Sequence, residues 1–109
     1  MFARILEFTP KAEKRDDLIK TIRQEVLPIM KKQPGFLELL PFVPDVAKEK
    51  MVVISMWTDR HVVERYVDEA FPQVARILKP VVAGRITVRM FKVETTVCEH
   101  FVEALTSVV

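Results

Sequence analysis

The fold is decided by residues 34–60, which read PGFLELLPFVPDVAKEKMVVISMWTDR. Pro34-Gly35 is a strong stop signal, so the element that ends there should be a helix. Two apolar runs follow, at 36–43 and 51–57, and the short polar connection between them predicts an antiparallel hairpin. Thr58-Asp59 is an N-cap pair, so the second of these strands should run directly into another helix.

Upstream of this stretch, the apolar pattern predicts one strand and one long helix. Residues 2–8 have apolar side chains on both parities, as in a strand buried on both faces. Residues 11–33 carry one stripe at three- and four-residue spacing, made by Leu18, Ile19, Ile22, Val26, Ile29 and Met30. Pro28 lies late in this helix and should kink it or tighten its last turns.

Downstream, residues 60–70 predict a helix whose apolar side consists of Val62, Val63, Tyr66 and Val67. Phe71-Pro72 interrupts that pattern and begins a shorter helix, which ends at Lys79-Pro80. A last strand is expected from residue 85 to residue 94. Pro41 has no N–H for a strand ladder, so the strand that contains it should be an edge strand or carry a bulge.

The predicted order is therefore β-α-β-β-α-β, which is typical of an α+β, ferredoxin-like fold with a four-stranded antiparallel sheet and helices on one face. Residues 1–94 should form this domain, and residues 95–109 a C-terminal tail. Both faces of the sheet are apolar, yet the helices can cover only one. The uncovered face would exceed the apolar patch usual for a monomer. The sequence therefore predicts a two-fold homodimer through the sheets.

The tail leaves an alternative open. Val97, Phe101 and Leu105 recur every four residues, which favours a short amphipathic helix. An extended arm on a partner subunit is the rival interpretation. A tail that folds over its own sheet would instead remove the need for a partner.

Composition excludes several classes of protein. The 17 basic and 15 acidic residues nearly balance, so no nucleic-acid partner is expected. No apolar run reaches the roughly 18 residues of a membrane span, and Met1 opens directly into Phe2-Ala3-Arg4-Ile5 without a leader pattern. Cys98 is the only cysteine, which fits a reducing compartment. We therefore expect a cytoplasmic protein that does not bind membranes.

Few residues suggest chemistry by themselves. Cys98 and His100 would share a face only on a strand, so a catalytic thiol is the weaker interpretation. Two histidines and one cysteine cannot make a standard zinc site. Arg4 and Arg89 each place a charge in an apolar strand, where it needs a partner. Ion pairs with the strand residues Glu7 or Glu38 are one possibility, and an anionic ligand in a pocket is the other.

Pro34-Gly35-Phe36 before the second strand and Ser55-Met56-Trp57-Thr58-Asp59 at the end of the third, within this element order, resemble the antibiotic biosynthesis monooxygenase superfamily of dimeric α/β-barrel proteins. The resemblance covers residues 1–94. It implies a homodimer and, in the active members, a pocket between sheet and helices lined by a tryptophan at the position of Trp57. The other interpretation of Trp57 is a large core residue.

The resemblance implies an activity that needs no cofactor: a monooxygenase for a small aromatic or quinol-like substrate. The site residues it suggests are Trp57, Tyr66 and Arg89, with Trp57 as pocket wall and the other two as polar contacts. Active members also use an asparagine, and this sequence contains none. Haem-degrading members carry a histidine where this chain has residues 66–71, and His61 lies too early, so neither haem nor a metal is expected.

A non-catalytic homodimer that binds a small apolar ligand is the alternative. In that case the pocket should be small, or filled by Phe36, Met56 and Met90.

Overall fold

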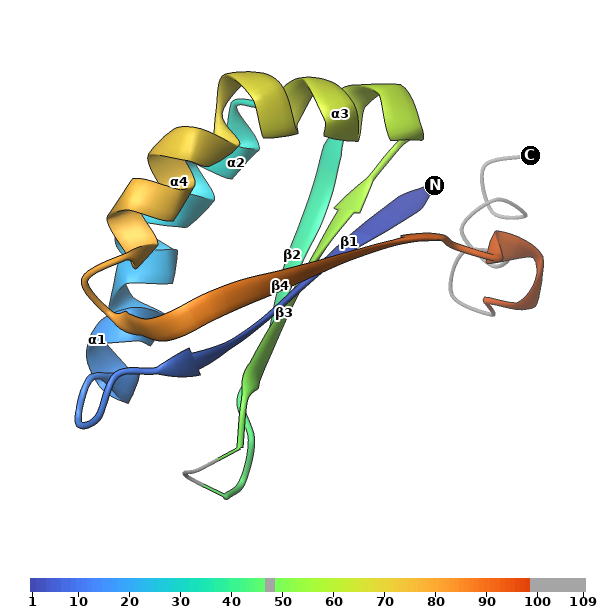
Figure 1. Ribbon diagram of the computed structural model, residues 1–109. Helices are drawn as coiled ribbons and strands as arrows, with labels where there is room; N and C mark the ends of the chain where they lie inside the picture. Colours follow the sequence, from blue (N-terminus) through green and yellow to red (C-terminus); the bar gives the residue numbers. More distant parts are fainter. Residues whose placement is uncertain (47–48, 99–109) are drawn as a thin grey trace.

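The computed structural model describes residues 1–46 and 49–98. Its sheet has four strands in the order β2-β3-β1-β4 (Figure 1). All three neighbouring pairs are antiparallel, and the strands are β1 (Phe2–Pro10), β2 (Phe36–Phe42), β3 (Met51–Trp57) and β4 (Val82–Lys92). This is the ferredoxin-like α+β architecture that the sequence predicts.

The helices lie on one face of the sheet, as Figure 1 shows. They are α1 (Arg15–Thr21), a π-helical segment η1 (Ile22–Val26), α2 (Leu27–Lys31), α3 (Arg60–Glu69) and α4 (Phe71–Leu78). A short 3₁₀ turn, η2 (Thr95–Val97), follows β4. No helix in the described parts of the chain has the length and apolarity needed to cross a bilayer.

The predicted caps and stripes are confirmed. Asp59 is the N-cap of α3, and its side chain accepts a hydrogen bond from the Val62 N–H at 3.1 Å. Pro72 lies in the first turn of α4, where a missing N–H costs nothing. The apolar stripes of the helices pack on the sheet and bury Leu18, Ile22, Val26, Met30, Val63, Tyr66, Val74 and Leu78.

The helix expected over residues 11–33 is shorter and less regular than predicted. Glu13 has a φ of 63°, a left-handed conformation that belongs to the turn after β1, so the helix begins only at Arg15. The distortion expected at Pro28 lies in the turn before it, where the Leu27 N–H donates to the Ile22 carbonyl across the π-helical turn. Proline clashes with the carbonyl of the preceding turn, which a wider turn accommodates.

Strand ends also differ from the sequence boundaries. The first strand extends to Pro10, which pairs with Val82, so the fourth strand begins earlier than residue 85. The predicted irregularity in the second strand is present, but the register shift falls between Phe36 and Glu38. β2 lies at the edge of the sheet, which is the position where a strand tolerates a proline such as Pro41.

Gly35, which lies between α2 and β2, packs closely against the start of α3. Its φ is +78°, and a Cβ built there would lie 2.5 Å from Val62 Cγ2 and 2.7 Å from Thr58 Oγ1. The Gly35 carbonyl also accepts a hydrogen bond from the Thr58 N–H at 2.9 Å. The stop signal in the sequence is therefore also a point of close packing between two elements.

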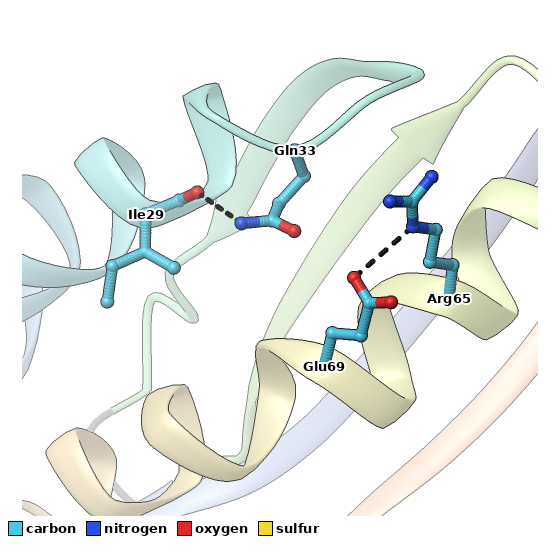
Figure 2. Close-up of polar contacts among 4 residues, drawn as sticks. All are labelled: Ile29, Gln33, Arg65 and Glu69. Carbon is cyan, nitrogen blue, oxygen red and sulfur yellow. Dashed lines mark hydrogen bonds and ion pairs between the residues drawn. The ribbon is translucent and has the colours of Figure 1, made fainter.

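Local polar contacts support the neighbouring helix ends (Figure 2). The Gln33 side chain donates to the Ile29 carbonyl at 3.1 Å, which adds a second hydrogen bond to the one from the Lys32 N–H in the last turn of α2. On α3, Arg65 and Glu69 form an exposed i,i+4 ion pair at 3.2 Å. Such contacts contribute only tenths of a kcal/mol each.

Within residues 1–46 and 49–98 no helix lies on the second face of the sheet (Figure 1), and this face is apolar, as predicted. Pairing across β3, β1 and β4 aligns Ile54 with Ile5 and Arg89, and Met56 with Ala3 and Phe91. We call this surface the open face. It consists of Ala3, Ile5, Leu40, Phe42, Val52, Ile54, Met56 and Phe91, with Glu7, Glu38, Thr87 and Arg89 among them.

The predicted tail is described only to residue 98, and the residues from 99 onward, His100 included, lie outside the described part of the chain. The domain boundary at residue 94 therefore stays a prediction.

Candidate functional site

A wide hollow lies between α3, the start of α4 and the helix-facing side of β4. Its volume is about 630 Å³, and we call it the groove. Val63 and Val67 on α3, Phe71 on α4, and Val88 and Met90 on β4 provide its apolar walls. Val88 and Met90 remain 44% and 39% exposed, because the helices do not cover the outer part of this edge strand. The groove is large enough for a ligand of two or three fused rings.

Arg4 is the innermost polar side chain of the groove. It lies on β1 between Ser55 of β3 and Met90 of β4, and only 3% of it is exposed. Its guanidinium stacks over Phe71, with the carbon 4.0 Å from the ring centroid, and lies 5.7 Å from the centroid of Tyr66. Burial lowers the pKa of Arg4, and the nearby Tyr66 acts in the opposite direction.

A smaller cavity of about 20 Å³ lies deeper, under the helices, and Arg4 lines both spaces. Ser55 and Tyr66 are the other polar residues at this inner cavity, whose remaining walls are apolar side chains such as Val26, Val53 and Val74. Its volume suits one water-sized or diatomic molecule. Burial raises the pKa of Tyr66 to about 12, against the effect of the Arg4 charge.

Trp57 lines neither space. It is fully buried, and its indole N–H donates to the Ser55 hydroxyl at 2.9 Å. Its ring packs on Tyr66 with centroids 4.7 Å apart and on Phe36 at 5.5 Å. The space directly beside Trp57 is therefore filled, and Trp57 contacts the site through Tyr66 and Ser55.

Of the three residues predicted for the site, the structure brings two together. Trp57 and Tyr66 are in contact, whereas Arg89 pairs with Ile5 on the open face and stacks over Phe91 at 4.9 Å. Successive strand residues point to opposite faces, so Arg89 cannot reach the groove of its own chain. The arginine in the groove is Arg4.

The prediction that Arg4 forms an ion pair with Glu7 or Glu38 is wrong. Glu7 is three residues further along the same strand and faces the opposite side of the sheet. Glu38 pairs with Met56 and also lies on the open face. Among residues 1–46 and 49–98 no carboxylate is within ion-pair distance of Arg4, and its Nε is buried without a hydrogen-bond partner.

Charged side chains of α3 form the rim of the groove. Arg60 and Glu64 pair with each other at 3.1 Å, and Asp68 lies further along the same side. Asp68 lines the groove only because α3 packs near β4, which is a matter of tertiary structure. His61 is exposed on the first turn of α3 and does not line the groove. In the part of the chain that the structure describes, no three His, Cys, Asp or Glu residues gather to hold a metal.

Comparison with known proteins agrees with this architecture. The profile of the family described as antibiotic biosynthesis monooxygenase matches residues 1–75. The chain belongs to this family. No curated protein matches the sequence closely enough to add to this.

Solved structures with the same fold share little sequence with this member of the family. A mutant of SnoaB, a cofactor-independent oxygenase from Streptomyces nogalater, superposes with a TM-score of 0.72 at 17% identity, over 85% of this chain and 92% of SnoaB. A further antibiotic biosynthesis monooxygenase superposes with a TM-score of 0.67 at 21% identity, over 85% of this chain and 98% of that protein. A mutant of MhuD with two manganese protoporphyrin IX molecules bound per active site gives 0.71 at 18% identity, over 86% and 95%. At these identities the likeness concerns the fold.

Proposed function

We propose that this protein is a cofactor-independent monooxygenase that oxidises a small aromatic or quinol-like substrate in the groove. The observation that carries the proposal is a hollow of about 630 Å³ with apolar walls and a single buried cation at its inner end. Membership of the family and the fold shared with SnoaB, a cofactor-independent oxygenase, support the same class of reaction.

The chemistry requires an electron-rich substrate, which itself reduces dioxygen. Loss of a proton from an activated ring CH₂ leaves a carbanion, whose electrons go to dioxygen as a C–O bond forms. The resulting hydroperoxide loses water as its O–O bond breaks, so that CH₂ and O₂ become C=O and H₂O. The protein orients the substrate, excludes water and stabilises the anion.

The residues of the site suit these tasks. Phe71 and Met90 hold the ring system, and Asp68 is a groove-lining carboxylate that can accept the proton. Arg4 stabilises the anion that results. The inner cavity, which Arg4 and Tyr66 also line, suits dioxygen, because small apolar cavities accept apolar gases. Trp57 holds the Tyr66 ring in position by direct contact.

We also propose that the protein works as a homodimer joined through the open face. The apolar residues on β1, β2, β3 and β4 that form this face require cover, and a second copy supplies an identical apolar surface. The groove opens on the helix side of the sheet, so the dimer leaves it accessible.

Oxygen consumption tests the oxidation directly. Purified protein with anthrones and reduced naphthoquinones in an oxygen electrode should consume one O₂ per carbonyl formed from an anthrone. Val88→Trp should block the groove and reduce the rate at least tenfold, whereas Arg65→Trp, on the outer side of α3, should not change it. If none of these substrates consumes oxygen above the uncatalysed rate, the proposed oxidation is refuted.

The alternative of a non-catalytic binding dimer predicts a small or filled pocket. Phe36 does fill the space beside Trp57, but Met56 lies on the open face and Met90 lines a wide groove. The volume and the buried cation favour the enzyme.

A further inference from the structure

Arg4 is the one side chain of the groove whose bonding is incomplete. Its Nε is the only buried side-chain nitrogen or oxygen without a hydrogen-bond partner among residues 1–46 and 49–98. The side chain is 97% buried, because 3% of its surface remains exposed. It lines both the groove and the inner cavity.

The charge of Arg4 cannot be relieved by proton loss. Arginine stays protonated in proteins even when burial disfavours the cation. The rings of Phe71 and Tyr66 offer their faces, at 4.0 and 5.7 Å, which solvates the cation only in part. A buried cation without an anion is unfavourable, so an occupant that brings an anionic oxygen binds here at an advantage.

We propose that Arg4 is an anion-binding residue, and that the ligands of the groove are aromatic molecules with one ionised oxygen at the inner end. A phenolate, an enolate and an aryl carboxylate share this chemistry. The use of this anion binding in an oxidation rests on the proposed function. The preference of the groove for an ionised ligand does not.

The surroundings of Arg4 define the class more narrowly. Val63, Val67, Val88 and Met90 require an apolar body between the ionised oxygen and the solvent. At the rim, Arg60 is paired with Glu64, which leaves Asp68 as the uncompensated charge, so a ligand with a second negative charge at its outer end would be repelled. Sugar phosphates and dicarboxylates are therefore disfavoured, and flat monoanions are preferred.

For the proposed oxidation, the preference has a chemical use. The ionised form of a phenol or quinol is the one that gives electrons to dioxygen. An arginine that binds this form more tightly than the neutral form lowers the pKa of the bound ligand. The other charged or titratable groups are Arg60, Glu64 and Asp68 at the groove and Tyr66 at the inner cavity, all on α3. To the groove, β4 and α4 contribute only Val88, Met90 and Phe71.

A matched pair of probes tests the inference: 4-nitro-1-naphthol and its methyl ether, which differ in whether the oxygen can ionise. Trp57 is the only tryptophan, and its fluorescence reports binding next to Tyr66. The naphtholate should bind at least tenfold more tightly than the ether, and its absorbance titration should move about one pH unit lower on binding, since a tenfold preference equals one pKa unit. Arg4→Met should remove both effects and keep binding of the ether, whereas Arg89→Met, on the open face, should remove neither.

Equal binding of the two probes to the wild-type protein would overturn the inference, as would a preference that persists in Arg4→Met. The wild-type comparison decides the matter even if Arg4→Met does not fold. A failure of oxygen uptake would refute the oxidation and leave the naphtholate preference intact. The two proposals are therefore separable.

Discussion

The hydroxyl of Tyr66 offers a quantitative test of the site, because Tyr66 is the only tyrosine of the chain. The phenol in an unfolded chain titrates near pH 10, whereas burial raises the pKa of Tyr66 to about 12 in the folded protein. The difference of roughly two pH units corresponds to about 2–3 kcal/mol of folding free energy. The folded protein holds this proton more tightly than the unfolded chain. The resulting contribution to stability is therefore fully present below about pH 10 and is lost as the pH rises toward about 12.

The near-ultraviolet absorbance of the phenolate measures this titration without interference from a second tyrosine. A rapid pH jump should give a midpoint near pH 12 for folded protein, and near pH 10 in denaturant. As the pH rises from about 10 to about 12, the free energy of unfolding of Tyr66→Phe should fall by about 2–3 kcal/mol less than that of the wild type. Arg4→Met should raise the midpoint further, because the neighbouring cation favours the phenolate. A folded-state midpoint equal to the denatured one would refute the buried Tyr66–Arg4 arrangement.

Three further outcomes follow from the packing. Arg4→Met should raise the free energy of unfolding in urea by about 1–2 kcal/mol, because removing an unsatisfied buried N–H outweighs the lost contact with the Phe71 ring; a loss of that size would mean that Arg4 is paired. Gly35→Ala should lower the free energy of unfolding by about 2–4 kcal/mol, because its backbone is left-handed and an added Cβ would overlap with Val62. Gly84→Ala, which has a positive φ but open space around it, should lower it by only about 1 kcal/mol. Similar shifts of the melting temperature in the two variants would contradict this. Ile54→Lys should convert the proposed homodimer to a monomer in sedimentation at micromolar concentration, and a variant that still sediments as a dimer would exclude the open face as the interface.

The arrangement of strands and helices could be predicted because its signals are local. Pro34-Gly35, the N-cap at Asp59 and the spacing of apolar residues each specify an element within a few residues. The apolar second face was also visible, since alternate residues point to opposite sides of a strand. The π-helical turn was not, because Pro28 indicates a distortion without saying which turn absorbs it.

The site was predicted less completely, and the reasons differ between residues. Tyr66 and Trp57 were proposed from their type and position, whereas the contact of Trp57 with Tyr66 in place of the groove depends on packing. The separation of Arg4 from Glu7 could have been read from the sequence, because residues three apart on a strand face opposite sides. The face of Glu38 was hidden by the register shift after Phe36, and so was its inability to pair with Arg4.

The groove itself has no signature in the sequence. It exists because α3 and α4 leave the outer part of β4 uncovered, which depends on how the helices lie across the sheet. Val88 and Met90 look like ordinary strand residues, and Asp68 like an ordinary helix surface. The sequence could not separate Arg89 from Arg4 for the same reason: both are charges in apolar strands, and only the tertiary structure shows which one faces the groove.

The most direct test of the account is a crystal structure of the protein with 4-nitro-1-naphtholate bound. The ring system should lie between α3 and β4, with its ionised oxygen at about 2.7–3.2 Å from a guanidinium nitrogen of Arg4. A naphtholate bound elsewhere, or a carboxylate side chain in place of the ligand oxygen at Arg4, would contradict it.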